Sequence, residues 1–312
     1  MGLAIIVHGG AGAIDVERYE AARAGCGEAA LAGWQVLREG GSALDAVQAA
    51  IIALENNPGF NAGTGAVLTA DGHAQLDAGM MEGGDLHAGA IAGVERIKNP
   101  IMLARAVLTS PHVLLMGEGA ERFAEESGIP FCDPRDLVTP AQYARWKRGY
   151  REGDDVNVGP GDEDPSGAPV HSDGDKHGTV GAVAMDASGL IVAGASTGGI
   201  GAKHPGRIGD TPLPGCGYYA ENALGGVSCT GHGEDFIRLL LARRALDFAG
   251  LGLPARQATE AAVELLGTRT GGSGGLIMID RAGRIGAAHN TPTMAHAYIM
   301  EGMTEPHAAI RV

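Results

Sequence analysis

The sequence predicts an α+β fold in which antiparallel sheets are covered by helices. Two patterns support this prediction: the helical segments occur in consecutive pairs, and the strand segments occur as hairpins joined by short turns. An alternating order of strand and helix would instead indicate a parallel sheet. The 52 glycines lie mostly within or beside apolar runs, and hydrophobic residues make up 45% of the 312 residues. The chain therefore has enough apolar material for a large, closely packed core.

The first half of the chain begins with a strand and a pair of helices. Residues 4–7 are apolar and run into a glycine loop, and residues 15–39 predict a helix. Ser42 is a good N-cap for a second helix over residues 43–54. The dipeptide Asp71-Gly72 predicts the turn of a β-hairpin. The remaining elements expected here are strands at 66–70, 73–77, 88–94 and 112–116 and helices at 100–108, 118–126 and 140–150.

Residues 151–177 differ in composition from the rest of the chain. Between Arg151 and Lys176 the sequence is rich in acidic residues, glycine and proline and contains almost nothing apolar. Such a stretch cannot bury enough surface to order itself, so we expect a flexible acidic linker.

The second half returns to sheet-forming sequence. Strands at 179–185 and 190–196 flank a turn that ends at Gly189, and strands at 275–280 and 284–289 flank a turn that ends at Gly283. Both pairs predict β-hairpins. The other elements expected are helices at 234–248 and 254–266 and a final strand at 295–300.

Composition disfavours several classes of function. The formal net charge of −14 disfavours nucleic acid, which needs a basic surface. No apolar run approaches the roughly 18 residues of a membrane span, and the N-terminus lacks the features of a signal peptide. Cys26, Cys132, Cys216 and Cys229 are too widely spaced for a zinc motif and are expected to be reduced. A cytoplasmic enzyme without nucleic-acid or membrane partners is therefore expected.

The end of the linker suggests a specific chemistry. Thr179 follows Gly178 directly, and a threonine hydroxyl is a weak nucleophile that needs an adjacent base. If the chain is cut before Thr179, its new α-amine, with a pKa of roughly 8, can act as that base. Gly178 can adopt the strained backbone that attack on its carbonyl requires. Thr179 is therefore a candidate nucleophile exposed by cleavage of its own chain.

Six glycine-containing motifs span nearly the whole chain. They are His8-Gly9-Gly10-Ala11-Gly12, Phe60-Asn61-Ala62-Gly63-Thr64-Gly65, His177-Gly178-Thr179-Val180-Gly181-Ala182-Val183, Ser196-Thr197-Gly198-Gly199, Gly206-Arg207-Ile208-Gly209-Asp210-Thr211 and Thr230-Gly231-His232-Gly233-Glu234. In these motifs and their order, the sequence resembles the plant-type L-asparaginases with isoaspartyl peptidase activity, in the N-terminal nucleophile hydrolase superfamily. The linker falls where the α and β chains of that family divide.

The resemblance implies a four-layer αββα sandwich and a threonine nucleophile. It implies a single domain that cleaves itself between Gly178 and Thr179 into an α subunit, 1–178, and a β subunit, 179–312. A homodimer of such cleaved α/β units is expected. Thr197 would hold the Thr179 hydroxyl by a hydrogen bond, and Thr230 with the backbone N–H of Gly231 would form the oxyanion hole.

The resemblance also assigns a pocket for the substrate's free amino-acid end. Arg207 would grip an α-carboxylate with two parallel hydrogen bonds, and Asp210 would accept from an α-ammonium. The backbone around Gly231 and Gly233 would complete the pocket, and Asn61 would point toward the site. The expected substrates are small molecules, namely L-asparagine and β-aspartyl dipeptides.

Members of the family often bind a sodium ion through backbone carbonyls. A cage of carbonyl oxygens suits a hard cation. No organic cofactor is implied. The carbonyls expected to hold a structural sodium ion are those of Leu54, Glu55, Asn57, Phe60, Ala62 and Thr64.

Two other glycine motifs lack the context that their functions require. Residues 271–275 match the serine hydrolase elbow, but a helix is expected before them and a strand after them, the reverse of the required order. Residues 215–220 resemble a loose dinucleotide fingerprint, but Pro212 and Pro214 prevent a strand from leading into them.

Related enzymes leave one alternative function open. Glycosylasparaginases also use a self-exposed threonine, although they usually have Asp where this chain has Gly178. Threonine aspartases usually have longer insertions, and a non-enzymatic scaffold would be expected to lack one of Thr179, Thr197 and Thr230. The sequence leaves open whether the leaving group is ammonia, a peptide amine or both.

Overall fold

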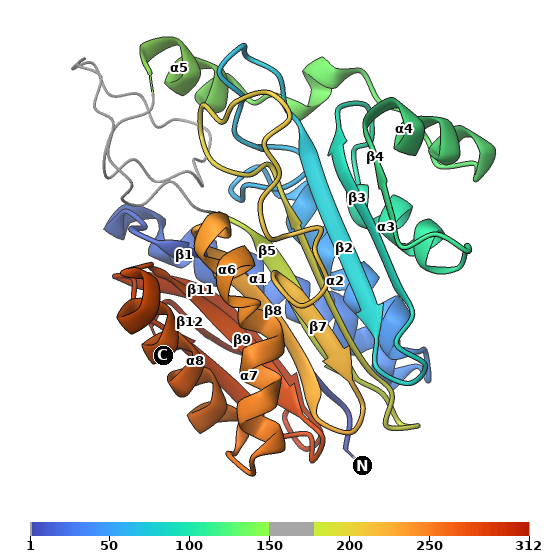
Figure 1. The fold of residues 1–312 in the computed structure, drawn as a ribbon, viewed down its shortest axis with the longest axis vertical. Helices are drawn as coiled ribbons and strands as arrows, with labels where there is room; N and C mark the ends of the chain where they lie inside the picture. The colour runs from blue at the N-terminus through green and yellow to red at the C-terminus, as the bar shows by residue number, and fades with distance from the viewer. Residues whose placement is uncertain (1, 150–177, 312) are drawn as a thin grey trace.

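The computed structural model describes residues 2–149 and 178–311 of the 312-residue chain. These residues form two β-sheets with helices packed on them (Figure 1). The predicted α+β class is therefore confirmed. The predicted linker, residues 151–177, lies outside the described residues.

The larger sheet has eight strands in the order β12-β11-β1-β5-β6-β2-β3-β4. Neighbouring strands are antiparallel, except that β3 and β4 run parallel. Its strands are β1 (Ala4–Gly12), β2 (Leu76–Glu82), β3 (Ala88–Val94), β4 (Leu114–Met116), β5 (Val180–Met185), β6 (Ile191–Thr197), β11 (Thr293–Met300) and β12 (His307–Ala309).

The smaller sheet has four antiparallel strands in the order β10-β9-β8-β7 and packs face to face against the larger one. One hydrophobic cluster contains Ile6 and Val183 of the larger sheet together with Ile277 and Ile279 of the smaller sheet, and it fills the space between them. The strands of the smaller sheet are β7 (Tyr218–Glu221), β8 (Gly225–Gly231), β9 (Gly274–Asp280) and β10 (Ile285–His289).

Helices cover the outer face of each sheet. Helices α1, α2 and α3 contact strands of the larger sheet, and α7 and α8 contact the smaller sheet in front of it (Figure 1). Short 3₁₀ turns lie at Val16–Arg18 and Pro134–Leu137. The helices are α1 (Tyr19–Arg38), α2 (Ala43–Asn56), α3 (Pro100–Leu108), α4 (Gly117–Glu126), α5 (Pro140–Arg148), α6 (Gly233–Leu239), α7 (Leu241–Gly250) and α8 (Ala255–Thr270).

Local sequence signals account for most of these elements. Ser42 caps α2 as predicted, because its side chain accepts from the N–H of Asp45 while the Asp45 carboxylate accepts from the N–H of Ser42. Thr139 caps α5 in the same way through the N–H of Gln142. The predicted hairpin β5–β6 closes at Gly189, and the hairpin β9–β10 closes at Gly283.

The predicted hairpin at residues 66–77 is wrong. The turn at Asp71-Gly72 forms, with the Thr69 N–H bonded to the His73 carbonyl, but the flanking segments are not strands. Their backbone groups are used elsewhere, since the N–H of Ala70 donates to the carbonyl of Lys203. The strand nearby, β2, begins at Leu76 and pairs with β3 and β6.

The predicted helix over 234–248 is broken in two at Leu240. This residue has a left-handed backbone, with φ of 54°, between α6 and α7. The N–H groups of Ala242 and Arg243, at the start of α7, donate to the carbonyls of Cys216 and Gly215. Carbonyls of a distant segment therefore accept hydrogen bonds from the first N–H groups of α7. Local sequence does not reveal this contact. The strands β7, β8 and β12 were also not predicted.

Cys26, Cys132, Cys216 and Cys229 are all free thiols, as predicted. Within residues 2–149 and 178–311, none of the helices combines the length and the apolar character needed to cross a membrane.

Candidate active site

Thr179 and Thr197 lie side by side at one end of the larger sheet. Thr197 is the last residue of β6, and Thr179 directly precedes β5, its antiparallel neighbour. Val183 and Ala195, on the same two strands, belong to the core between the sheets. Since side chains alternate between the two faces of a strand, Thr179 and Thr197 project into this interlayer space. Both are buried.

Thr230 reaches the same space from the smaller sheet. Its neighbour on β8, Cys229, packs with α7 and α8 on the outer face, so Thr230 faces inward. The backbone N–H of Ala11, near the end of β1, donates to the Thr230 hydroxyl at 3.3 Å. Because β1 pairs with β5, this contact places Thr230 at the same end of the sheets as Thr179. Three separate parts of the chain thus place three threonines at the same end of the interlayer space.

A chain of hydrogen bonds joins the candidate nucleophile to the peptide bond before it. The Thr179 hydroxyl donates to the Thr197 hydroxyl at 3.2 Å, and Thr197 donates to the carbonyl oxygen of Gly178 at 2.8 Å. The N–H of Gly199 donates to the Thr197 hydroxyl at 2.9 Å. Thr197 therefore contacts both the candidate nucleophile, Thr179, and the carbonyl of Gly178 that Thr179 would attack.

Asn61 supplies a second donor to the same carbonyl. Its side-chain amide donates to the carbonyl oxygens of Gly178 and Gly199, both at 2.7 Å. Its own oxygen accepts from the N–H of Val67 at 2.9 Å, which fixes the orientation of the amide. The Gly178 oxygen thus receives hydrogen bonds from Asn61 and Thr197. Two preorganised donors on one carbonyl oxygen stabilise negative charge that develops there.

Gly231 lies next to Thr230 in a place where no side chain fits. A Cβ at Gly231 would lie 2.4 Å from the ring of Phe236 and 2.6 Å from the carbonyl oxygen of Ser273. The close approach of α6 and β9 therefore requires glycine here. Gly231 is the last residue of β8, and its backbone directly follows Thr230.

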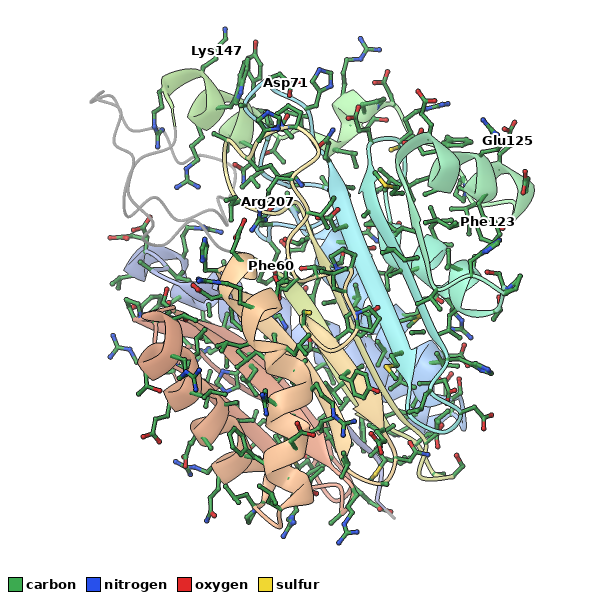
Figure 2. The ribbon with its side chains drawn as sticks, in the orientation of Figure 1. Phe60, Asp71, Phe123, Glu125, Lys147 and Arg207 are labelled. Atoms are coloured by element: carbon green, nitrogen blue, oxygen red, sulfur yellow. The ribbon has the colours of Figure 1, made fainter. Side chains whose placement is uncertain are left out.

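Arg207 and Asp210 lie together beside the start of α6. A Cβ at Gly233 would lie 2.9 Å from Asp210 Oδ1 and 3.0 Å from Arg207 Nη2, so this glycine makes room for both groups. Figure 2 shows Arg207 in the upper half of the view, above Phe60. The predicted pocket residues Arg207, Asp210 and Gly233 are thus brought into contact.

Glu234 binds the guanidinium of Arg207, a partner that the sequence did not identify. Arg207 donates from Nε at 2.9 Å and from Nη2 at 2.6 Å to the two carboxylate oxygens. Burial opposes ionisation of Glu234, but the hydrogen bonds from Arg207 lower its pKa to about 2. This pairing has the bidentate geometry with which Arg207 would bind a substrate carboxylate. A carboxylate ligand would therefore have to displace Glu234 or share Arg207 with it.

Asp210 has a buried carboxyl group with one oxygen free to accept a hydrogen bond. Its Oδ2 has no hydrogen-bond partner among the described residues, and the side chain is 4% exposed. Burial raises the pKa of Asp210 to about 7, although nearby Arg207 acts in the opposite direction. A cationic group bound beside Asp210 would favour its ionised form.

His8 and Ser228 form a buried polar contact deeper between the sheets. His8 Nε2 lies 3.0 Å from Ser228 Oγ, which donates to the carbonyl of Gly194 at 3.1 Å. Burial lowers the pKa of His8 to about 3, so its ring is neutral at neutral pH. Gly181 lies opposite His8 in the sheet, and a Cβ there would lie 2.0 Å from Ser228 Oγ. The contact links β1 and β5 to β8, the strands that carry or adjoin Thr179 and Thr230.

The loop predicted to hold sodium is a tight turn closed by backbone hydrogen bonds, among them one from the N–H of Thr64 to the carbonyl of Glu55. The carbonyls of Leu54, Glu55 and Asn57 each accept one backbone hydrogen bond, and a carbonyl oxygen can accept two. A Cβ at Gly65 would lie 3.0 Å from the carbonyl oxygen of Phe60. The donor set is therefore compatible with a hard cation such as sodium, which takes oxygen ligands.

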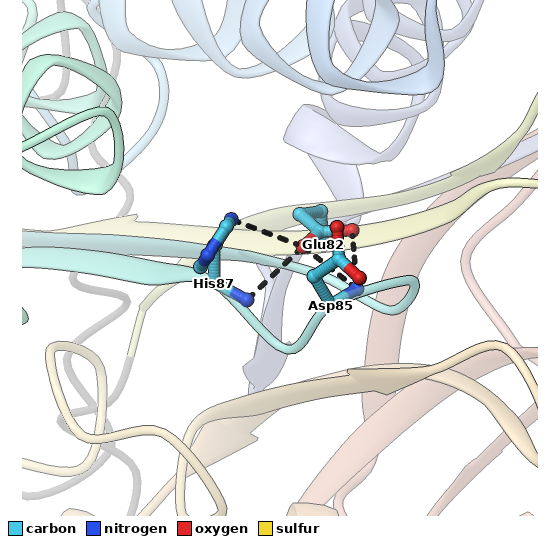
Figure 3. Close-up of side chains that lie close together, drawn as sticks. All are labelled: Glu82, Asp85 and His87. Carbon is cyan, nitrogen blue, oxygen red and sulfur yellow. Dashed lines mark hydrogen bonds and ion pairs between the residues drawn. The ribbon is translucent and has the colours of Figure 1, made fainter.

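Glu82, Asp85 and His87 come within metal-binding range of one another at the end of β2 (Figure 3). The carboxylate of Glu82 already accepts from three backbone N–H groups, those of Gly84, Asp85 and His87. These bonds are the ones that hold the β2–β3 turn closed. The cluster is thus explained by the turn itself.

Comparisons with known proteins agree on one family. A family model described as "Asparaginase" matches residues 1–308. A plant-type L-asparaginase of Pyrococcus abyssi is 48% identical, covering 99% of this chain and 100% of its own. Isoaspartyl peptidase/L-asparaginases of Danio rerio and Mus musculus are 40% and 42% identical; each comparison covers 96% of this chain, and 92% and 89% of the respective relatives.

Proposed function

This chain belongs to the asparaginase family, and we propose that it hydrolyses the side-chain amide of L-asparagine and the isopeptide bond of β-aspartyl dipeptides, releasing L-aspartate. The observation that carries the proposed mechanism is the hydrogen-bond chain from Thr179 through Thr197 to the carbonyl of Gly178. This chain places the Thr179 hydroxyl, the Thr197 hydroxyl that accepts from it, and the carbonyl of Gly178 next to one another.

The first step of the proposal is cleavage of the chain before Thr179. The Thr179 hydroxyl attacks the carbonyl carbon of Gly178, and negative charge develops on an oxygen that already accepts from Asn61 and Thr197. The C–N bond then breaks, its nitrogen takes the proton of the Thr179 hydroxyl and becomes the neutral α-amine of Thr179, and an ester joins Gly178 to the Thr179 oxygen. Water hydrolyses this ester, which yields chains 1–178 and 179–312.

In substrate turnover, the freed Thr179 acts as both base and nucleophile. Its α-amine, with a pKa of roughly 8, takes the proton from the hydroxyl as the oxygen attacks the substrate's side-chain carbonyl. The Thr230 hydroxyl and the N–H of Gly231 donate to the developing oxyanion. Ammonia or the peptide amine leaves with a proton from the α-amine, and water then hydrolyses the β-aspartyl ester on Thr179.

Arg207 and Asp210 hold the other end of the substrate. Arg207 binds the α-carboxylate and Asp210 the α-ammonium of the aspartyl group. Support comes from their contact across Gly233 and from the unused oxygen on buried Asp210. Binding requires Arg207 to leave or share its bond to Glu234.

The assembly belongs to the same proposal. We propose that the two facing sheets with helices outside form the four-layer αββα sandwich of the N-terminal nucleophile hydrolases, and we expect a cytoplasmic homodimer of cleaved α/β units. The carbonyls of residues 54–64 would hold a structural sodium ion, which would stiffen the turn that carries Asn61. No organic cofactor is required, and nucleic acid and membranes are not expected partners.

A direct experiment tests the proposal. Purified protein should resolve into two chains on a denaturing gel, the second beginning at Thr179, and Thr179→Ala should stay intact. The cleaved protein should release aspartate from L-asparagine and from β-Asp-Leu. Turnover of glycosylated asparagine with both of these substrates inert would instead establish the alternative, a glycosylasparaginase. A wild-type chain that stays intact yet turns substrate over would rule out the self-exposed nucleophile.

A further inference from the structure

Lys203 and Asp77 form a buried charged pair beside the candidate active site. Lys203 Nζ lies 3.8 Å from Asp77 Oδ2, and both side chains are 0% exposed. Lys203 Nζ also donates to the carbonyl of Gln75 at 2.9 Å, and Asp77 Oδ1 accepts from the N–H of Gly93 at 2.8 Å. Burying two charges is costly, and well-packed apolar residues often do as well for stability. The pair therefore calls for an explanation in function.

The pair lies directly next to the Thr179–Thr197 contact. Asp77 on β2 is the register partner of Thr197 on β6. Lys203 approaches Gly199, two residues beyond this strand end, because a Cβ at Gly199 would lie 3.0 Å from Lys203 Nζ. Gly199 in turn donates its N–H to the Thr197 hydroxyl.

The same lysine belongs to the loop that carries Arg207 and Asp210. We call residues 198–210 the recognition loop. Other hydrogen bonds also hold this loop: the N–H of Gly206 donates to the side chain of Gln75 at 2.8 Å, and the N–H of Ala202 donates to the carbonyl of Leu68 at 2.8 Å. The carbonyl of Lys203 also accepts from the N–H of Ala70. The buried ammonium group of Lys203 links the recognition loop to Asp77 on β2.

The charges of this region act on one another. Burial lowers the pKa of Lys203 and raises the pKa of Asp77, while the attraction between the two groups opposes both shifts. The charge of Arg207 lowers the pKa of both groups, and the charge of Asp77 raises the pKa of Asp210. Removing Lys203 would leave the Asp77 carboxylate uncompensated next to Arg207 and Asp210.

We propose that the Lys203–Asp77 pair is a positioning pair that holds the recognition loop in register with the Thr197 end of β6, so that Arg207 and Asp210 meet an aspartyl group attached at Thr179. The inference rests on the function proposed above. The pair touches neither the substrate nor the reacting atoms, and it acts through the placement and charge of Arg207.

The test measures self-cleavage, KM and kcat for Lys203→Met. Self-cleavage depends on Thr179, Thr197 and Asn61, so the variant should cleave at the wild-type rate. KM for L-asparagine and for β-Asp-Leu should rise at least about tenfold, because small misplacement of binding groups is expensive, while kcat changes by less than about threefold. An unchanged KM in folded, cleaved Lys203→Met would overturn the inference.

A double variant separates positioning from mere stability. Lys203→Met alone leaves a buried unpaired carboxylate and should lower the melting temperature. Lys203→Met with Asp77→Asn removes both charges, keeps an acceptor for the N–H of Gly93 and should recover the melting temperature. The proposal expects KM to stay high in the double variant, because the hydrogen bond from Lys203 to the Gln75 carbonyl and the ion pair with Asp77 are still lost. Recovery of KM together with the melting temperature would show a purely structural pair.

Matched controls keep this test separate from the proposed function. Arg256→Met removes an exposed ion pair with Glu260 on α8 and should leave KM and the melting temperature unchanged. If wild-type protein fails to hydrolyse L-asparagine and β-Asp-Leu, the proposed function fails. If wild type is active and Lys203→Met matches Arg256→Met in KM, only the positioning pair is refuted.

Discussion

The hydroxyl of Thr197 donates to the carbonyl oxygen of Gly178 at 2.8 Å while it accepts from the hydroxyl of Thr179 at 3.2 Å. One small side chain thus orients the attacking group and polarises the carbonyl under attack. Both contacts depend on the Thr197 oxygen and not on its methyl group.

Thr197→Val keeps the shape of the side chain and removes this oxygen. Loss of an oxyanion donor costs about 3 kcal/mol, so self-cleavage should slow by about a hundredfold or more. Mass spectrometry of the purified protein over time measures the fraction cleaved. Thr197→Ser retains the hydroxyl and should cleave at a rate much closer to wild type; equal rates for wild type and the valine variant would exclude this role for Thr197.

Arg207→Lys keeps the positive charge but loses the planar fork that binds a carboxylate through two bonds. We expect KM for L-asparagine to rise by about tenfold or more, since one charge-assisted hydrogen bond is lost. Self-cleavage should be unaffected. Steady-state kinetics on cleaved protein measures the change, and Arg135→Lys, at an exposed position, is the control. Failure of Arg207→Lys to cleave would show that Arg207 acts on Thr179 as well.

Substrate affinity should depend on the ionisation of Asp210. Burial raises the pKa of Asp210 to about 7, so the group is mostly protonated below that pH and lacks the negative charge that attracts an ammonium group. Raising the pH from 5.5 to 7.5 should therefore lower KM for L-asparagine. The Thr179 α-amine, with a pKa of roughly 8, loses its proton as the pH rises, so kcat should also increase with pH.

Asp210→Asn separates these two effects. In this variant KM should be high and should no longer fall with pH, while the pH dependence of kcat should remain. A wild-type KM that is constant between pH 5.5 and 7.5 would mean that Asp210 is already ionised at the lower pH.

Gly181→Ala tests the close packing between the sheets. The new methyl group would lie 2.0 Å from Ser228 Oγ and 2.5 Å from His8 Nε2. The free energy of unfolding of the variant should therefore be about 1–3 kcal/mol lower than that of wild type. Gly27→Ala is the matched control, because a Cβ there has neighbours only at 3.9 Å and α1 favours alanine by about 1 kcal/mol. Urea unfolding should show opposite signs for the two variants. A loss of stability no larger for Gly181→Ala than for Gly27→Ala would contradict the packing argument.

The sequence by itself determined the elements whose signals are local. The helix starts at Ser42 and Thr139 follow from side chains that bond nearby N–H groups, and the hairpins closed at Gly189 and Gly283 follow from short turns. It also singled out the nucleophile candidate, because Thr179 follows an acidic stretch and Gly178. These inferences need only neighbouring residues or a motif read in order.

Tertiary structure alone decided the contacts between distant segments. The segment at 66–70 is not a strand because its backbone bonds to Asn61 and to Lys203, and the helix after residue 233 breaks where the carbonyls of Gly215 and Cys216 meet its N–H groups.

The same holds for the partners of the site residues. Glu234 on Arg207, Ser228 on His8 and Asp77 on Lys203 are separated by 27, 220 and 126 positions, the last being 203 minus 77. No local pattern encodes such pairings, since they depend on how the two sheets pack. The sequence thus named Thr179, while the fold decided which groups surround it.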